Sequence, residues 1–288
     1  GLASALRQLQ LSPDETPLVS IQPKGNAAPL FFIHPSGGSV HWYTDLASAL
    51  GKNQPFFGLQ AIGLTGKNPI QTQIDVMAAT YIQAIRSQQP EGPYRIGSWS
   101  LGVIIAYEIA QQLSAQGEEI AFLGLLDQGP NLPHEKPEDD ADYLVQVFGQ
   151  NIPLDLQELR CLDSENQVRR VLEIAKREHF VYPQISFEQF NHFIHILRTQ
   201  TEAWRNYHPK SYSGHVTLFR AIEQDHPNCA TRDLGWSALV QGGVSVIDVP
   251  GDHLTMLHPP HIKKLADQVK QCLAEIKDNS VQVFQTDR

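Results

Sequence analysis

The sequence predicts an α/β protein with a mostly parallel central sheet, helices on both faces and an inserted helical lid. Three observations predict this class. Short apolar runs alternate with helix-like periods as far as residue 126, the alternation breaks over 131–207, and strand-like runs resume at 215. We therefore expect one core made of residues 1–130 and 208–288, with residues 131–207 forming the lid.

The first half of the core begins with the run LFFI at residues 30–33, which stops at a glycine-rich loop and is typical of a buried strand. Residues 55–59 and 94–98 are two further strand candidates. Between them, four apolar residues recur at helical spacing, namely Val76, Tyr81, Ile82 and Ile85. Strand and helix thus alternate, as in a parallel sheet with crossover helices.

The rest of the chain continues this pattern on either side of the lid. Apolar residues within 103–113 predict a buried helix, and the dense run 120–126 predicts a strand. Three helix-like stretches near 139–149, 165–180 and 186–207 form the lid. The remaining candidates are strands at 215–220 and 244–249 and a last amphipathic helix over 261–276.

Composition excludes several classes of protein. The chain has 288 residues, 41% of them hydrophobic, and a formal net charge of −9, without the basic surplus that binds nucleic acid or an anionic membrane. No apolar run is long enough to span a bilayer and no signal peptide begins the chain, so we expect a cytoplasmic protein. The three cysteines lack the spacing of a disulfide framework or a zinc site. Without an obvious dimerising helix pair, a monomer is expected.

The residues Trp99-Ser100-Leu101-Gly102 lie between a predicted strand and a predicted helix. A sharp turn there exposes a serine hydroxyl, and the start of the helix supplies unpaired N–H groups. This setting predicts Ser100 as a nucleophile and the Leu101 N–H as one oxyanion donor. The pattern departs from G-x-S-x-G because Ser98 replaces the first glycine, with Gly97 one position earlier.

A base and an acid are predicted at two other strand ends. His253 follows the last predicted strand, where it could deprotonate Ser100, and Asp127 follows the strand 120–126, where it would orient the imidazole. The chain order Ser, Asp, His is that of α/β-hydrolases. Asp225, after the strand at 215–220, is the rival acid. Asp252 is interpreted as a residue that stabilises its own loop.

The loop His34-Pro35-Ser36-Gly37-Gly38 is expected to supply the second oxyanion donor, the N–H of Ser36, because glycines let its backbone approach a bound carbonyl. His34 is interpreted as a structural residue of this loop. Trp99, beside the nucleophile, could line a substrate channel or simply pack. The sequence leaves both roles open.

At these residues the chain resembles the type I thioesterase domains that end nonribosomal peptide and polyketide synthases, members of the α/β-hydrolase superfamily. The matching segments include FFIHPSGGSVHWY, PEGPYRIGSWSLGVIIAYEIAQQL, LGLLDQGP, YHPKSYSGHVTLFRA and VPGDHLTMLHPP. In that family the acid sits on the strand before the lid, which favours Asp127 over Asp225. Ser98 and Val103 depart from the family's G-G-W-S-x-G-G pattern.

The resemblance implies a substrate tethered as a thioester to the 4'-phosphopantetheine arm of an upstream acyl or peptidyl carrier protein, the expected partner. No metal or cofactor of the enzyme's own is implied. Ser100 would take the acyl chain, and water or an internal nucleophile would release it by hydrolysis or macrocyclisation; family habit favours macrocyclisation. Apolar lid residues could face the acyl chain, although packing between helices is favoured for them, namely for Phe148, Phe187, Phe190 and Ile194.

Three alternatives remain open from the sequence. A free-standing editing thioesterase would share the site, but the long insertion and a start at Gly1 rather than Met favour a domain excised from a longer protein. A carboxylesterase acting on small free esters would use the same nucleophile. A catalytically inactive binding module is disfavoured by the intact Ser, Asp and His order.

Overall fold

The computed structural model describes residues 16–132, 135–223 and 231–286, and within these ranges seven strands form one sheet. The strand order is β1-β3-β2-β4-β5-β6-β7. Only β1 runs antiparallel to its neighbour, β3, and all the other neighbouring pairs are parallel. The bounds are Leu18–Gln22 (β1), Leu30–Ile33 (β2), Phe56–Leu59 (β3), Tyr94–Trp99 (β4), Ile120–Leu126 (β5), Val216–Ala221 (β6) and Val244–Val249 (β7).

Helices cover both faces of the sheet, since the central strands are apolar on both sides. One face carries α3 (Ile74–Gln88) and α4 (Gly102–Ala115), whose apolar residues join a core cluster with Phe31, Ile96 and Leu125. The other face carries α2 (Thr44–Leu50) and the first half of α9 (Ile262–Thr286). Three short 3-10 helices are η1 (His41–Tyr43), η2 (Trp236–Ala238) and η3 (Thr255–Leu257).

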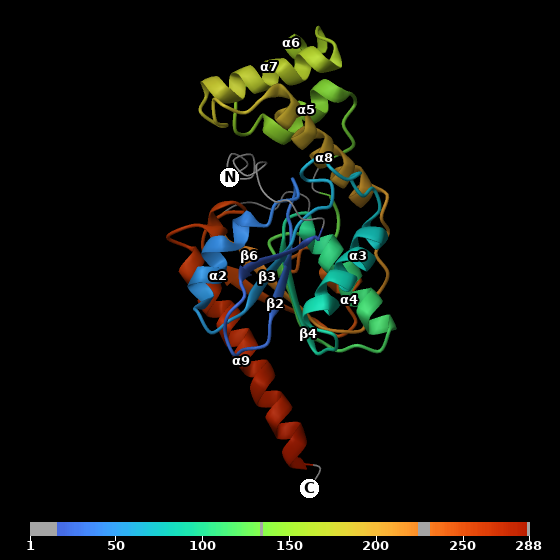
Figure 1. Ribbon diagram of the computed structural model, residues 1–288, viewed down its shortest axis with the longest axis vertical. Helices are drawn as coiled ribbons and strands as arrows, with labels where there is room; N and C mark the ends of the chain where they lie inside the picture. Colours follow the sequence, from blue (N-terminus) through green and yellow to red (C-terminus); the bar gives the residue numbers. More distant parts are fainter. Residues whose placement is uncertain (1–15, 133–134, 224–230, 287–288) are drawn as a thin grey trace.

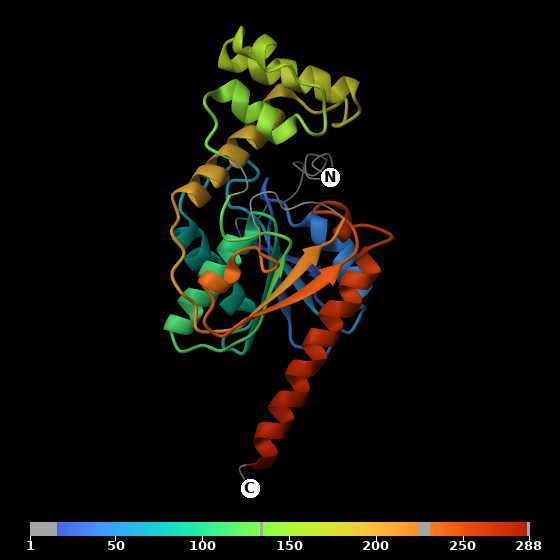
Figure 2. The same cartoon turned by 180° about the vertical axis from the view of Figure 1, so that it is seen from behind.

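Among the described residues, four helices lie between β5 and β6, and they stand beyond the carboxyl ends of the parallel strands (Figures 1 and 2). They are α5 (Asp140–Phe148), α6 (Leu156–Arg160), α7 (Ser164–Arg177) and α8 (Phe187–Arg205). Each begins at a side chain that accepts backbone N–H bonds, namely Asp139, Asp155, Asp163 and Ser186. The long α8 leads from the outer lid back to the core.

Apolar side chains hold the lid helices together. Phe148 and Phe190 are fully buried, with ring centroids 5.7 Å apart, and Ile194 is also buried. The half-buried Phe187 packs against the same cluster of buried apolar residues, and the guanidinium of Arg169 lies over its ring. The burial of Phe148 and Phe190 supports the interpretation of these residues as packing contacts.

The predicted fold class is confirmed, and the differences are at short elements. The sequence did not reveal β1, α2 or α6, which have five, seven and five residues. Such short elements show too few periods of an apolar pattern to be recognised, and they form because neighbouring elements support them.

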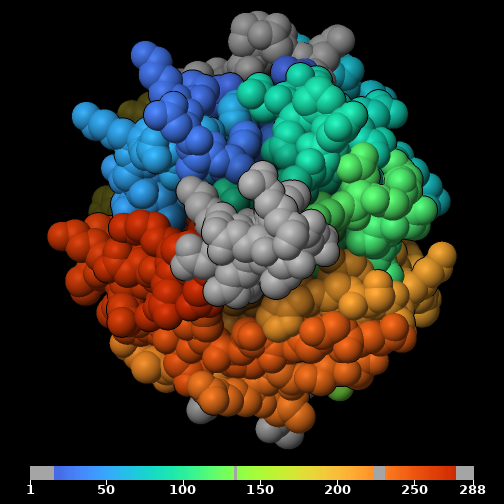
Figure 3. Space-filling view, turned by 90° about the horizontal axis from the view of Figure 1, so that it is seen from below, coloured from blue at the N-terminus to red at the C-terminus, as the bar shows by residue number. Residues whose placement is uncertain are grey.

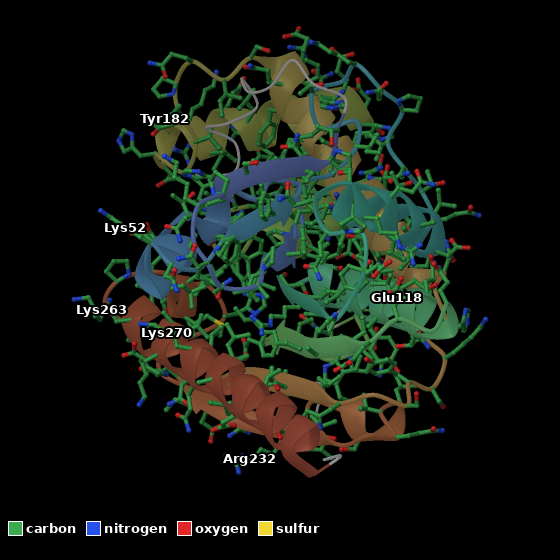
Figure 4. All side chains as sticks on the ribbon, turned by 60° about the horizontal axis from the view of Figure 1, so that its bottom comes forward. Lys52, Glu118, Tyr182, Arg232, Lys263 and Lys270 are labelled. Carbon is green, nitrogen blue, oxygen red and sulfur yellow. The ribbon has the colours of Figure 1, made fainter. Side chains whose placement is uncertain are left out.

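Viewed from below, segments that precede the lid (blue to green) and segments that follow it (orange to red) together form this face of the molecule (Figure 3). Segments far apart in the sequence thus build one core around the sheet. The labelled charged side chains lie at the periphery, among them Lys52, Glu118, Arg232, Lys263 and Lys270 (Figure 4). In the described part of the chain, no helix combines the length and apolarity needed to cross a bilayer.

Candidate active site

Ser100 lies in the turn that joins β4 to α4. Its φ angle is +58°, in the left-handed region that only a tight turn imposes on a serine. The turn is held by two hydrogen bonds, since the Ser100 N–H donates to the Leu126 carbonyl at 3.4 Å and the Val103 N–H donates to the Ser100 carbonyl at 3.1 Å. The side chain therefore projects from the carboxyl edge of the sheet as a nucleophile elbow requires.

Two glycines make this turn possible. A Cβ on Gly97 would lie 2.3 Å from the Phe32 ring, and a Cβ on Gly102 would lie 2.5 Å from the His34 carbonyl oxygen. The second contact brings the start of α4 against the loop that follows β2. The start of α4, next to Leu101, therefore lies against the backbone where the 34–38 loop begins.

The two departures from the family pattern occupy buried positions. Ser98 is 0% exposed on β4, and its hydroxyl has no hydrogen-bond partner among the described residues. Val103 is fully buried in the core cluster on α4. Both substitutions are thus accommodated inside the core rather than at the substrate-facing surface.

Asp127 follows β5 directly and is 2% exposed. Its N–H donates to the Phe219 carbonyl at 2.8 Å, and its Oδ1 accepts the Ala221 N–H at 2.7 Å. The first bond ties the Asp127 backbone to β6, and the second ties its carboxylate to the same strand. The second carboxylate oxygen, Oδ2, lies 3.0 Å from Nδ1 of His253.

His253 lies in the loop after β7, with its side chain 26% exposed. Its Nδ1 is 3.0 Å from Asp127 Oδ2 and 3.1 Å from the Asp127 carbonyl oxygen. Both neighbours are acceptors, so a proton on Nδ1 satisfies them and leaves Nε2 as the basic nitrogen. Asp127 thereby fixes both the orientation and the tautomer of the imidazole.

Trp99 contacts both the backbone and the ring of His253. Its Nε1–H donates to the His253 carbonyl at 2.9 Å, and the two rings are 5.1 Å apart at 32°. Trp99 is 3% exposed and also packs on Trp42, at 4.8 Å between ring centroids. Of the two roles left open for Trp99, packing is the one that this burial favours.

The sequence did not point to Tyr43, which links two strand ends at the site. Its hydroxyl donates to the Ile33 carbonyl at 2.6 Å and accepts the Trp99 N–H at 3.2 Å. Burial raises the pKa of this phenol far above its ordinary value, so it stays neutral and can donate. No sequence signal separates this tyrosine from the other aromatic residues of the core.

The loop after β2 is held by His34, which confirms the structural interpretation of that residue. Its ring is fully buried, with Nδ1 2.9 Å from the Pro35 carbonyl and Nε2 2.8 Å from the Tyr81 hydroxyl. Burial lowers the pKa of His34 to about 4. The imidazole is therefore neutral near pH 7 and suited to a structural role.

The N–H groups of the same loop differ in their partners. The Gly37 N–H donates to Oε1 of Gln200 at 3.0 Å, and the Gly38 N–H donates to the Pro35 carbonyl at 3.1 Å. The N–H of Ser36 has no acceptor among the described residues, as expected for a group that receives a ligand oxygen. Gln200 was not recognised from the sequence, although a glutamine on the apolar side of a helix is a signal that could have drawn attention to it.

The structure therefore brings Asp127 and His253 into direct contact and places Ser100 at the adjacent strand end. Among the described residues, no hydrogen bond joins the Ser100 hydroxyl to the imidazole; such bonds often form only when substrate is present. Asp225 lies outside the described residues. Asp252 accepts the N–H groups of Leu254 and Thr255, which confirms its role in the loop.

The described residues contain no cluster of three or more histidine, cysteine or acidic side chains placed to hold a metal ion. Cys161 and Cys272 are free thiols. The chemistry that the described arrangement can perform is acyl transfer to a hydroxyl, since it combines a serine, a carboxylate-oriented imidazole and two backbone donors.

Comparison with known proteins identifies the family of the chain. A family model described as "Thioesterase domain" matches residues 28–273, which include all the described elements from β2 to η3 and the first part of α9. The match spans both the core and the helical insertion.

Two curated relatives are synthetases. The chain is 29% identical over 265 residues to atromentin synthetase from Tapinella panuoides, covering 86% of this chain and 28% of that protein. It is 29% identical over 280 residues to a dimodular nonribosomal peptide synthase from Bacillus subtilis, covering 96% of this chain and 12% of that protein. The chain thus spans about a quarter or less of the length of these relatives.

A similar solved structure is that of AB3403, a four-domain nonribosomal peptide synthetase. The superposition has a TM-score of 0.78 at 26% identity and covers 89% of this chain and 20% of that one. The same fold therefore occurs as one part of a multidomain synthetase.

Proposed function

The chain belongs to the thioesterase domain family, and from this premise we propose that it releases an acyl or peptidyl chain from a carrier-protein thioester in nonribosomal peptide or polyketide biosynthesis. The observation that carries the proposal is the contact between Asp127 Oδ2 and His253 Nδ1 at 3.0 Å, next to the strand end that bears Ser100. The similarity to synthetase segments supports a tethered substrate.

The first step forms an acyl-enzyme. His253 Nε2 takes the proton of Ser100 as its Oγ attacks the thioester carbonyl, and the N–H groups of Ser36 and Leu101 receive the oxyanion. The tetrahedral intermediate then collapses, the C–S bond breaks, and the thiolate of the phosphopantetheine arm takes the proton from His253. Because a thioester is already activated, a serine nucleophile suffices.

The second step releases the chain. A water molecule, or a hydroxyl or amine of the acyl chain itself, gives its proton to His253 and attacks the ester, and Ser100 leaves with that proton restored. The lid decides between hydrolysis and macrocyclisation by controlling the access of water and the conformation of the acyl chain. The helix α8 is the lid element that bonds to the loop carrying Ser36, through Gln200 and the Gly37 N–H.

Labelling with a fluorophosphonate tests the nucleophile. Peptide mass spectrometry should find the adduct on Ser100, and Ser100→Ala should abolish both labelling and acyl-enzyme formation. His253→Ala should lower the acylation rate by several orders of magnitude, because the members of a triad act as a unit. Acylation of the Ser100→Ala variant at the normal rate would falsify the assignment.

A substrate comparison tests the thioesterase activity. Acyl-loaded carrier protein and p-nitrophenyl esters of the same acyl group are offered to the same enzyme, and we expect a higher kcat/KM for the carrier-bound thioester. Preference for the free ester would support a carboxylesterase instead. Mass spectrometry of the released acid or ring then identifies the acceptor in the second step.

A further inference from the structure

The lid helix α8 packs directly on the loop that carries Ser36. The ring of Phe193 lies 2.6 Å from the position that a Cβ on Gly37 would occupy, and Leu197 lies 3.7 Å from it. Both side chains are buried. No residue larger than glycine fits between the loop and the helix, so a displacement of α8 changes the surroundings of this loop.

A single hydrogen bond joins the two elements at this contact. Oε1 of Gln200 on α8 accepts the N–H of Gly37 at 3.0 Å. Gln200 is 1% exposed, although a buried amide is costly unless it is bonded. Its Nε2 lies 3.5 Å from the position that a Cβ on Gly38 would occupy, so the amide group lies against both glycines.

The loop is held partly by its own bonds at the Pro35 carbonyl and partly by Gln200 of α8. Gly37 and Gly38 have φ angles of +87° and +82°, and glycine adopts many other conformations at little cost. The bond from Gly37 to Gln200 fixes the peptide that follows Ser36. The Ser36 N–H, which has no acceptor among the described residues, belongs to the preceding peptide, whose Pro35 carbonyl is bonded by the Gly38 N–H and lies 2.9 Å from His34 Nδ1. The Gln200 bond thus fixes the neighbouring peptide, on which the direction of the Ser36 N–H also depends.

We propose that Gln200 is a positioning residue that couples the docking of α8 to the oxyanion site. With α8 docked, its amide oxygen holds Gly37 and aims the Ser36 N–H at the reacting carbonyl. With α8 displaced, the loop loses this acceptor and the donor relaxes. The inference rests on the proposed acyl transfer to Ser100 and adds that the lid controls the chemical step as well as access.

Another bond between α8 and the core offers a matched control. Nε2 of His192 lies 2.8 Å from the Gly63 carbonyl, on a loop other than the one bearing Ser36. His192→Ala therefore removes a contact between lid and core without touching the Gly37 bond. If Gln200 acts only by holding the lid in place, the two variants should behave alike.

The test uses three substitutions in the full chain. Gln200→Met keeps the size of the side chain but removes the acceptor oxygen. Gln200→Asn has a side chain too short to reach Gly37. Gln200→Glu keeps an acceptor oxygen at the same distance from the backbone. For each variant, a fluorophosphonate gives the inactivation rate at saturation and the apparent affinity for the inhibitor. An acyl N-acetylcysteamine thioester gives kcat and KM. Denaturation gives the free energy of unfolding.

We expect Gln200→Met and Gln200→Asn to lower kcat and the inactivation rate by about tenfold, less than the 10²–10³ typical of deleting an oxyanion donor, with KM little changed. Gln200→Glu should recover most of the rate, and His192→Ala should keep wild-type kcat. If Met fails to fold, the Asn and Glu variants decide the question.

Two outcomes overturn the inference. Folded Met and Asn variants with wild-type rates would show that the bond has no influence on catalysis. An equal loss in His192→Ala would show that only lid docking matters. Failure of the proposed function is distinguishable, because then the wild type itself would show no acylation that depends on Ser100.

Discussion

Ser100 and Asp127 occupy equivalent positions on neighbouring strands: each is the first residue after the paired residues Trp99 and Leu126, and their φ angles are +58° and +51°. Parallel strands place their carboxyl ends at one edge, so the proposed nucleophile and the proposed acid are positioned by the same strand register. His253 arrives from β7, two strands beyond β5, and is oriented by Asp127.

The carboxylate of Asp127 is predicted to act through the tautomer of His253. In Asp127→Asn the amide oxygen can still accept the Ala221 N–H, but the amide nitrogen then faces Nδ1 and favours the wrong tautomer. We expect kcat to fall by about 10⁴, as for an analogous change in a serine protease triad. Burst kinetics would measure this. Asp252→Asn is the matched control, and a comparable loss in Asp225→Asn alone would reassign the acid.

Trp99 is predicted to position the His253 loop. Trp99→Phe removes the 2.9 Å bond to the His253 carbonyl but keeps an aromatic ring beneath the imidazole. We expect kcat to fall about tenfold with KM little changed, because small misplacements of catalytic groups are costly. The control is Trp42→Phe, since the buried Trp42 Nε1 has no partner among the described residues. Equal effects of the two changes would argue against the hydrogen bond.

The conformation of Ser100 is predicted to cost stability. A residue with a Cβ is strained at φ +58°, whereas glycine is not. Ser100→Gly should therefore be more stable than Ser100→Ala by about 1 kcal/mol, although both lack the hydroxyl. Urea denaturation at pH 7.5 compares them. Equal unfolding free energies would mean that the turn relaxes in the alanine variant.

The buried hydroxyl of Ser98 is predicted to be unfavourable. It has no hydrogen-bond partner among the described residues, and an unsatisfied buried polar group costs about 1–3 kcal/mol. Ser98→Ala should raise the free energy of unfolding by roughly 1 kcal/mol and leave acylation unchanged. A loss of stability would indicate that the hydroxyl is satisfied in solution.

His34 is predicted to make stability depend on pH. Burial lowers its folded-state pKa from 6.5 to about 4, so the unfolded chain binds more protons between these values. The contribution of neutral His34 to the free energy of unfolding is fully present above pH 6.5. It is lost as the pH falls through 4, and the total loss is up to about 3 kcal/mol. Denaturation of wild type and His34→Gln from pH 7.5 to 4 should show a steeper decline for wild type. Parallel curves would contradict this.

Local patterns in the sequence were sufficient for the larger elements and to select the candidate catalytic residues. The apolar runs at β2, β5 and β7 and the period of α4 are local signals, and the strand-turn-helix around Ser100 follows from small residues between two such signals. His253 and Asp127 were predicted because each follows a strand. A residue that directly follows a predicted strand can be identified from the sequence.

Tertiary structure alone decided how these residues are supported. The bonds from Trp99 to His253, from Tyr43 to Ile33 and from Gln200 to Gly37 join residues 154, 10 and 163 positions apart. Contacts of this kind depend on which side chains face each other once the sheet and the lid have packed. Periodicity places a residue on a face of its own element, whereas the partner across that face is set by the packing of the whole chain.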